Sequence, residues 1–127
     1  MGSVRVLFFK DDHGRAPLLD WAATLKPKAR AKLIERVRVL KSMGYRMLES
    51  RTMAAYLRDD IYELRFKSEG VQYRTLFFFS GRDICMLSHG LAKDTAEVPA
   101  EEIDQAIESK QKFEANHDLH TYREFSE

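Results

Sequence analysis

Residues 61–93 read IYELRFKSEGVQYRTLFFFSGRDICMLSHGLAK, and the rest of the predicted domain is built around them. Its middle part, residues 71–79, is rich in the aromatic and β-branched side chains that favour strand interiors. Residues 68–70 (SEG) and 81–82 (GR) have the composition of tight hairpin turns. The stretch therefore predicts three consecutive strands in an antiparallel meander. Three cations lie along the same path, namely Arg65, Arg74 and Lys93.

The flanking sequence adds one strand and three helices. Residues 4–9 (VRVLFF) predict the first strand. Pro17 and Pro27 suit the first turns of a short helix and of a longer helix that ends at Gly44. Pro99 opens the last helix, whose first turn carries the acidic residues that the helix dipole favours. Residues 45–57 have no clean period, and we interpret them as a packed connector with helical turns.

This order of elements predicts one α+β domain, in which a helical hairpin and a C-terminal helix pack on a small, mainly antiparallel sheet. The sheet consists of the N-terminal strand and the three-strand meander. The core is expected to span about residues 4–113, and residues 114–127 to form a polar tail. The apolar residues of the longer helix form a buried stripe, and four cations are expected to lie mostly away from it: Lys28, Lys32, Arg36 and Arg38.

The composition is that of a globular protein, with 44% apolar and 32% charged residues among 127. No apolar run is long enough to span a membrane, so we expect no membrane association. The single cysteine, Cys85, has no partner for an internal disulfide, which favours a reducing compartment such as the cytoplasm.

Charge is divided unevenly along the chain. Residues 1–93 contain 18 Lys and Arg against 10 Asp and Glu, and residues 94–127 contain 3 against 10. The two parts therefore carry net charges of +8 and −7. The basic part favours a polyanionic partner. An equally good explanation is that two helices differ in their solvated faces, and charge alone does not decide between the two.

The sequence contains no recognisable motif for a metal or a nucleotide. The four histidines are scattered and the cysteine stands alone, so no metal centre is predicted. A P-loop, a dinucleotide fingerprint and a nucleophile elbow are also absent. We therefore expect neither a metal nor a cofactor.

The cations of the meander are the remaining candidates for chemistry. Strand alternation places Arg65 on the same face as Glu63 and Lys67, and Arg74 on the face opposite Tyr73. A guanidinium grips phosphate bidentately and stabilises charge that develops during phosphodiester cleavage. An arginine on a half-buried strand is more often an ion-paired structural residue, and Glu63 or Asp60 would suffice as the partner of Arg65. Tyr73 is likewise more often a core residue than a platform for a base.

Several sequence motifs occur in a specific order. They are residues 57–65 (LRDDIYELR), 73–74 (YR), 87–95 (LSHGLAKDT), 98–99 (VP) and 102–106 (EIDQA). Together with the first strand and the helix start at residues 17–21 (PLLDW), they resemble the RelE/ParE toxin superfamily, and within it the phage-derived, HigB-type branch. The resemblance covers about residues 4–113.

The resemblance implies a RelE-like fold and the toxin of a type II toxin–antitoxin system. Such toxins are endoribonucleases that cut mRNA in the ribosomal A site without a metal. The 2′-OH attacks the adjacent phosphate and leaves a 2′,3′-cyclic phosphate and a 5′-OH. The implied partners are a helix-turn-helix antitoxin of the HigA type, the ribosome and mRNA. Carried onto this chain, the implied site has Arg65, Arg74 and Lys93 as catalytic residues, His89 as a possible helper, and Tyr73 and Lys67 as RNA contacts.

One position departs from the family pattern, because the second residue of a basic pair that begins with Lys93 is Asp94 here. An anion at this place weakens the attraction for phosphate and makes Lys93 a poorer base. Two alternatives therefore stay open. One is a ParE-like inhibitor that binds a topoisomerase and does no RNA chemistry, although ParE relatives generally lack the catalytic cations. The other is a degenerate prophage domain that retains only antitoxin binding.

Overall fold

The computed structural model describes residues 3–93 and 97–123, except for the Lys93 side chain. The chain begins with strand β1 (Arg5–Phe8), helix α1 (Pro17–Ala23) and helix α2 (Pro27–Met43). A short 3-10 helix, η1 (Gly44–Glu49), leads to strands β2 (Ala54–Arg58), β3 (Ile61–Ser68), β4 (Val71–Ser80) and β5 (Ile84–Lys93). Helix α3 (Ala100–Ala115) follows. None of the helices in the described ranges has the length and apolar character needed to cross a membrane.

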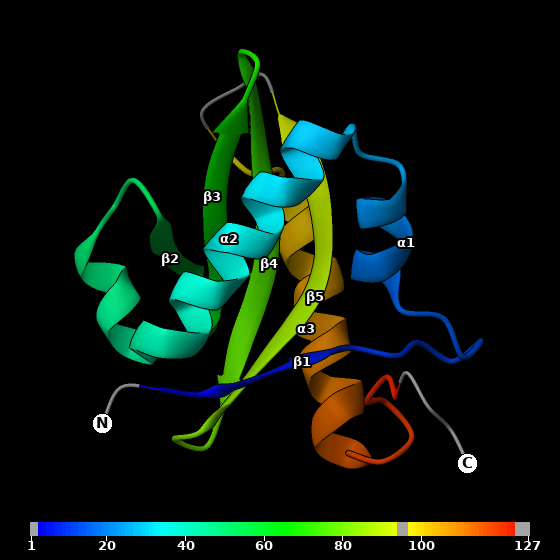
Figure 1. Cartoon of the computed structure of the whole chain (residues 1–127). Coiled ribbons are helices and arrows are strands. Elements are labelled where there is room, and N and C mark those ends of the chain that lie inside the picture. The colour runs from blue at the N-terminus through cyan, green and yellow to red at the C-terminus, as the bar shows by residue number, and fades with distance from the viewer. Residues whose placement is uncertain (1–2, 94–96, 124–127) are drawn as a thin grey trace.

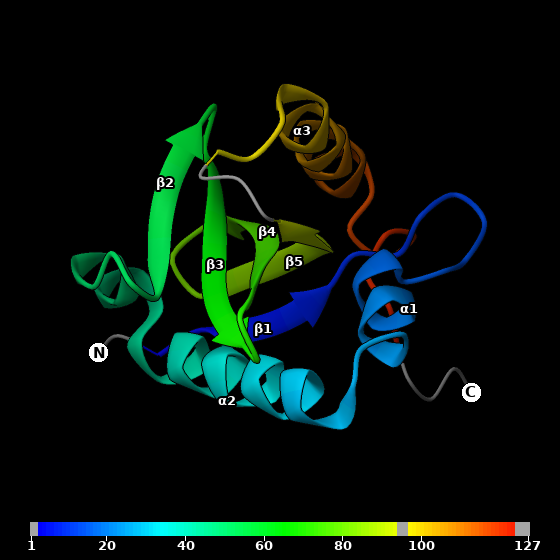
Figure 2. The same cartoon turned by 90° about the horizontal axis from the view of Figure 1, so that it is seen from above.

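The strands form one five-stranded sheet in the order β1-β5-β4-β3-β2. β1 runs parallel to β5, and the other neighbours are antiparallel. Figures 1 and 2 show α1 and α2 on one side of this sheet and α3 on the other. The predicted α+β fold, with a mainly antiparallel sheet, a helical hairpin and a C-terminal helix, is thereby confirmed and is compatible with a RelE-like fold.

Each face of the sheet has its own apolar core. The core under α1 and α2 includes Leu18, Leu40, Leu64, Phe77 and Leu87. The core under α3 includes Ile61, Leu76, Phe78, Met86, Ile103 and Phe113. Burying a side chain of this size contributes about 1.5–3 kcal/mol, so the central strands are held firmly from both sides.

The segment that we interpret as a connector contains an edge strand. β2 pairs with β3 from Ala54, opposite Leu64, to Arg58, opposite Ile61. β2 is short, with the sequence AAYLR, and it lies at the edge of the sheet beside β3 only. Its apolar and polar residues therefore do not alternate clearly. The pairing reaches as far as the carbonyl of residue 53, which accepts the N–H of Arg65. The last residues of β3 therefore extend past the edge strand.

A bulge in β5 determines which of its side chains face α3. Leu76 and Phe77 of β4 pair with His89 and Leu87 of β5, so Ser88 is an extra residue between two ladder pairs. Because of this extra residue, the side chains of both Ser88 and His89 hydrogen-bond to residues of α3.

Gly90, the next residue of β5, lies under the ring of Trp21. A Cβ atom at position 90 would lie 2.3 Å from two carbons of that ring. The Trp21 ring also contacts Phe66 and Tyr73 edge-on, at centroid distances of 6.4 and 6.1 Å. Glycine at position 90 thus allows α1 to pack closely over the central strands.

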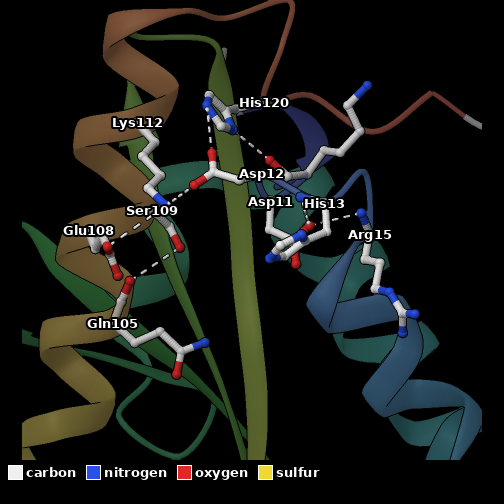
Figure 3. Close-up of polar contacts among 10 residues, drawn as sticks. Asp11, Asp12, His13, Arg15, Gln105, Glu108, Ser109, Lys112 and His120 are labelled. Carbon is white, nitrogen blue, oxygen red and sulfur yellow. Dashed lines mark hydrogen bonds and ion pairs between the residues drawn. The ribbon is translucent and has the colours of Figure 1, made fainter.

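Part of the predicted polar tail packs against the start of the chain. Thr121 forms a β-bridge with Phe9, and the His120 ring stacks on the Phe9 ring at a centroid distance of 5.4 Å. Figure 3 shows Asp12 between His120 and Lys112 of α3, with 2.6 Å between the Asp12 Oδ2 and Lys112 Nζ atoms. Both His120 and Thr121 are buried. These residues therefore belong to the packed domain, which differs from the expectation of a polar tail.

Candidate functional site

The strand register brings the candidate cations of β3 and β4 side by side. Arg65 lies directly opposite Arg74, and the neighbouring pair on the same face is Glu63 opposite Leu76. Residues paired across neighbouring strands share a face of the sheet. Since Leu76 packs in the core under α3, Arg65, Arg74 and Glu63 all project from that side.

A single buried carboxylate joins the two guanidinium groups. Glu63 Oε2 lies 2.7 Å from Arg65 Nη2 and 2.9 Å from Arg65 Nε, and Glu63 Oε1 lies 2.8 Å from Arg74 Nε. The Glu63 side chain is 3% exposed, that of Arg74 is 7% exposed and that of Arg65 is 32% exposed. The contact with Arg74 lacks the alignment of a hydrogen bond and is purely ionic. The negative charge between the two arginines offsets the repulsion between them.

The remaining contacts hold both guanidinium planes in place. Arg65 Nη1 donates to the carbonyl oxygen of Arg51 at 2.6 Å, and Arg74 Nη1 donates to Gln72 Oε1 at 3.2 Å. Each of the three nitrogens of Arg65 thus has one protein contact. A guanidinium has five N–H bonds. The contacts to described residues do not use all five, so Arg65 keeps N–H donors for a ligand.

A pocket of about 330 Å³ opens beside these arginines. It lies where β3 extends past β2, and it is lined by α2, the turn before β2, β3 and β4. The lining residues are Arg36, Thr52, Arg65, Phe66, Lys67, Gln72 and Arg74. Four of these seven side chains are cations and three are uncharged. This cation-lined pocket therefore presents an excess of positive charge to a ligand.

Arg36 is a pocket residue that the sequence analysis missed, and the expectation that it lies mostly away from the buried stripe of α2 is wrong. It is half-buried, three residues after the buried Leu33 and four before the buried Leu40, so it shares their side of the helix. The spacing of Arg36 from these two leucines could have placed it on the buried side of the helix from the sequence alone. The Arg36 Nε atom is buried, and no described residue accepts a hydrogen bond from it. A half-buried cation beside other cations is unfavourable, and an anion in the pocket would offset that cost.

His89 lies on the face of the sheet that carries Arg65, but it does not line the pocket. Its Nε2 atom is 2.9 Å from Glu102 Oε1 of α3, and its Nδ1 atom is 2.9 Å from Ser88 Oγ. Burial lowers the pKa of His89, and the hydrogen bond with Glu102 acts in the opposite direction. Because protein groups occupy both ring nitrogens, His89 joins β5 to α3.

Tyr73 lies on the other face of the sheet and is not brought to the pocket. Its ring stacks on Phe66 at a centroid distance of 5.0 Å and contacts Trp21 of α1. This is the face opposite Arg74, as strand alternation requires. The contacts are those of a packed aromatic cluster.

Lys93 is located by its backbone only. It pairs with Gln72 at the end of β5, and Gln72 lines the pocket. The backbone of Lys93 is therefore next to the pocket, whereas its side chain and Asp94 lie outside the described residues.

Other groups that could carry chemistry do not form a second candidate site in residues 3–93 and 97–123. No group of three or more His, Cys, Asp or Glu residues there is arranged to hold a metal ion. The Cys85 thiol is buried in the core, and burial raises its pKa. The cation-lined pocket is thus the strongest candidate in the part of the chain that the structure describes.

The sequence matches one protein family along most of its length. Residues 20–111 match the family described as phage derived protein Gp49-like (DUF891). The matched region runs from α1 into α3 and includes every residue that lines the pocket. No curated protein matches the chain. Because the match covers well over half of the 127 residues, the chain belongs to the phage-derived Gp49-like family, which is related to the toxins of toxin–antitoxin systems.

Proposed function

We propose that the protein is the toxin of a type II toxin–antitoxin system and that it cuts mRNA on the ribosome. One observation carries the proposal: Arg65 and Arg74 lie side by side, held by the buried Glu63, in a pocket lined by four cations. Membership of a toxin-related family supports the same class of function. The resemblance to HigB-type toxins extends the proposal to cleavage of mRNA.

A phosphodiester is the class of ligand that best suits the pocket. Phosphate oxygens accept paired hydrogen bonds from the planar fork of arginine. Glu63 and the Arg51 carbonyl fix the orientation of the Arg65 guanidinium before a ligand arrives. A donor fixed in this way loses little conformational freedom on binding. Thr52 and Gln72 supply uncharged polar groups that suit a ribose or a base.

In the proposed reaction, the 2′-oxygen attacks the adjacent phosphorus and the bond from phosphorus to the 5′-oxygen breaks. The 2′-OH gives its proton to a base, and the departing 5′-oxygen takes up a proton. The products are a 2′,3′-cyclic phosphate and a 5′-OH. Negative charge grows on the non-bridging oxygens in the transition state, where Arg65 and Arg74 stabilise it. Removing one fixed donor of this kind typically lowers the rate by about 10²–10³.

The other candidate residues have different roles in the proposed reaction. Lys93 is the third catalytic cation, acting as acid, base or electrostatic stabiliser. Lys67 lines the pocket and contacts the RNA backbone. His89 helps indirectly, by holding α3 against the sheet through Glu102. Tyr73 has no part in the proposal, because it packs on the opposite face.

The proposed protein partner is an antitoxin of the helix-turn-helix, HigA-like type. The relation of the family to toxins of toxin–antitoxin systems supports such a partner. The ribosome and mRNA are the proposed targets, and the excess of cations in the pocket supports a polyanionic ligand.

Induction of variants in a bacterial host tests the function. Growth and the 5′ ends of cellular messages are compared for the wild type, Arg65→Ala, Arg65→Lys and the control Arg82→Ala, which changes an exposed residue in the turn between β4 and β5. The wild type and the control should arrest growth and cut messages. Arg65→Ala should lower cleavage by about 10²-fold or more, and Arg65→Lys should be intermediate because it keeps the charge but loses the fork.

Two results would overturn the proposal. One is message cleavage by Arg65→Ala at the wild-type level, with both proteins equally folded by circular dichroism. The other is growth arrest with intact messages and inhibited topoisomerase supercoiling, which would favour the ParE-like alternative.

A further inference from the structure

A second and larger groove adjoins the cation-lined pocket along α2. It has a volume of about 590 Å³ and is bounded by α2 and by the turn between β3 and β4. Lys67 lines both hollows, so this side chain lies between them. Figure 1 shows the first turns of α2 beside the tip of the β3–β4 hairpin, and Figure 2 shows the same neighbourhood from above.

The charge of this α2 groove is predominantly positive. Its charged lining residues are the cations Lys28, Lys32, Arg38 and Lys67 and the acids Glu35 and Glu69. Lys28 and Glu69 form an exposed ion pair with 3.9 Å between Nζ and Oε2, which contributes little. Lys32 and Arg38 are exposed and form no ion pair with another described residue. These two cations are therefore available to an anionic ligand.

α2 and α3 lie on opposite faces of the sheet and carry opposite net charges. α2 carries six cations and one acid, a net charge of +5. α3 carries five acids and two cations, a net charge of −3. A polyanion that leaves the pocket is repelled on the side of α3 and attracted on the side of α2. The charge difference thus favours a path for the polyanion along α2.

We infer that the α2 groove binds the part of a single-stranded RNA that flanks the scissile phosphate, with Lys67 at the junction. The inference rests on the proposed function and names the path of the substrate. An acidic peptide is a poorer fit, because Ala31 is the one apolar residue in the described lining and peptides gain affinity chiefly from apolar anchors. Cationic contacts to phosphates position a strand without reading its sequence.

The test measures binding separately from cleavage. The probes are a 2′-O-methyl octanucleotide and a 2′-O-methyl trinucleotide, which lack the attacking hydroxyl and so cannot be cut. The test variant combines Lys32→Glu with Arg38→Glu. The control combines Arg5→Glu with Arg82→Glu, which makes the same charge change at the opposite end of the sheet, where Arg5 pairs with Ile84. Fluorescence anisotropy is recorded over a range of salt concentrations.

The groove variant should bind the octanucleotide about tenfold or more weakly than the control, with a salt slope smaller by about 1.4, because two phosphate contacts are lost. Trinucleotide binding should be the same in both proteins. Equal octanucleotide binding by the groove variant and the control would overturn the inference, as would a wild type that binds the octanucleotide no better than the trinucleotide.

A competition with polyglutamate distinguishes a protein partner from RNA. If the groove variant loses affinity for the peptide and keeps it for the octanucleotide, the groove is a protein-binding surface and the inference is wrong. If the wild type binds the octanucleotide in the expected way but cuts no message, the proposed function is wrong and the inference about the α2 groove still holds.

Discussion

Replacing Glu63 with glutamine removes the negative charge between Arg65 and Arg74 while keeping the size of the side chain. The cost can be worked out from burial. Glu63 is 3% and Arg74 is 7% exposed, and removing one partner of such a buried pair costs about 3–5 kcal/mol. The Arg65 side chain is 32% exposed and screened by water, so its contact adds less than about 1 kcal/mol. Glutamine still offers an oxygen to Arg65, and we therefore expect a loss near the lower end, about 3 kcal/mol of unfolding free energy.

Urea unfolding at pH 7, followed by circular dichroism, measures this loss. A change of about 3 kcal/mol should lower the midpoint by about 1.5–2 M for a domain of this size. Glu69→Gln is the matched control, because its carboxylate is exposed and lies 3.9 Å from Lys28, and it should cost less than about 0.5 kcal/mol. A double variant with Arg74→Met in addition should regain much of the lost stability, because no buried charge is then left unpaired.

Two outcomes would refute this reasoning. If Glu63→Gln lowers the unfolding free energy by less than about 1 kcal/mol, the Glu63 carboxylate does not compensate the charges of the adjacent arginines. If adding Arg74→Met makes the protein still less stable, the loss does not come from an uncompensated charge.

Two further predictions concern stability. Lowering the pH below about 6.5 should reduce the unfolding free energy, because burial lowers the pKa of folded His89 and the unfolded chain binds the proton first. Urea titrations of the wild type and His89→Asn test this, since the variant should depend less on pH and equal dependence would contradict the assignment. Gly90→Ala should cost about 1–3 kcal/mol, because its Cβ would overlap the Trp21 ring. The same titration should show a smaller cost in a Trp21→Leu background, and an equal cost would argue against the overlap.

The faces of β3 and β4 could be predicted because side chains alternate along a strand. Spacing alone places Arg65 on the same face as Glu63, and it places Arg74 on the face opposite Tyr73. The shared face of the two arginines depends on the register between strands, in which Arg65 pairs with Arg74. The family resemblance implies that Tyr73 contacts RNA, whereas alternation places it on the face opposite Arg74. The position of Tyr73 in the structure, against Phe66 and Trp21, agrees with alternation.

Features that depend on how one element pairs or packs with another were not predictable in the same way. β2 exists because residues 54–58 find an edge of β3, and its own sequence gives little sign of a strand. The side of His89 depends on the extra residue Ser88, which interrupts the alternation of β5. Arg36 joins the pocket because α2 packs beside β3, although its spacing from Leu33 and Leu40 was a usable signal.

The partners of β1 have a consequence for synthesis of the chain. Arg5 pairs with Ile84, 79 positions later, and Phe9 pairs with Thr121, 112 positions later. The β3–β4 hairpin, in contrast, closes between sequence neighbours and needs no distant segment. A nascent chain can therefore form the arginine-bearing hairpin before its first strand has a partner, because β1 pairs with β5 and β5 follows that hairpin in the chain. The bridge between Phe9 and Thr121 can form only after α3 has been synthesised, so the two ends of the packed domain are joined last.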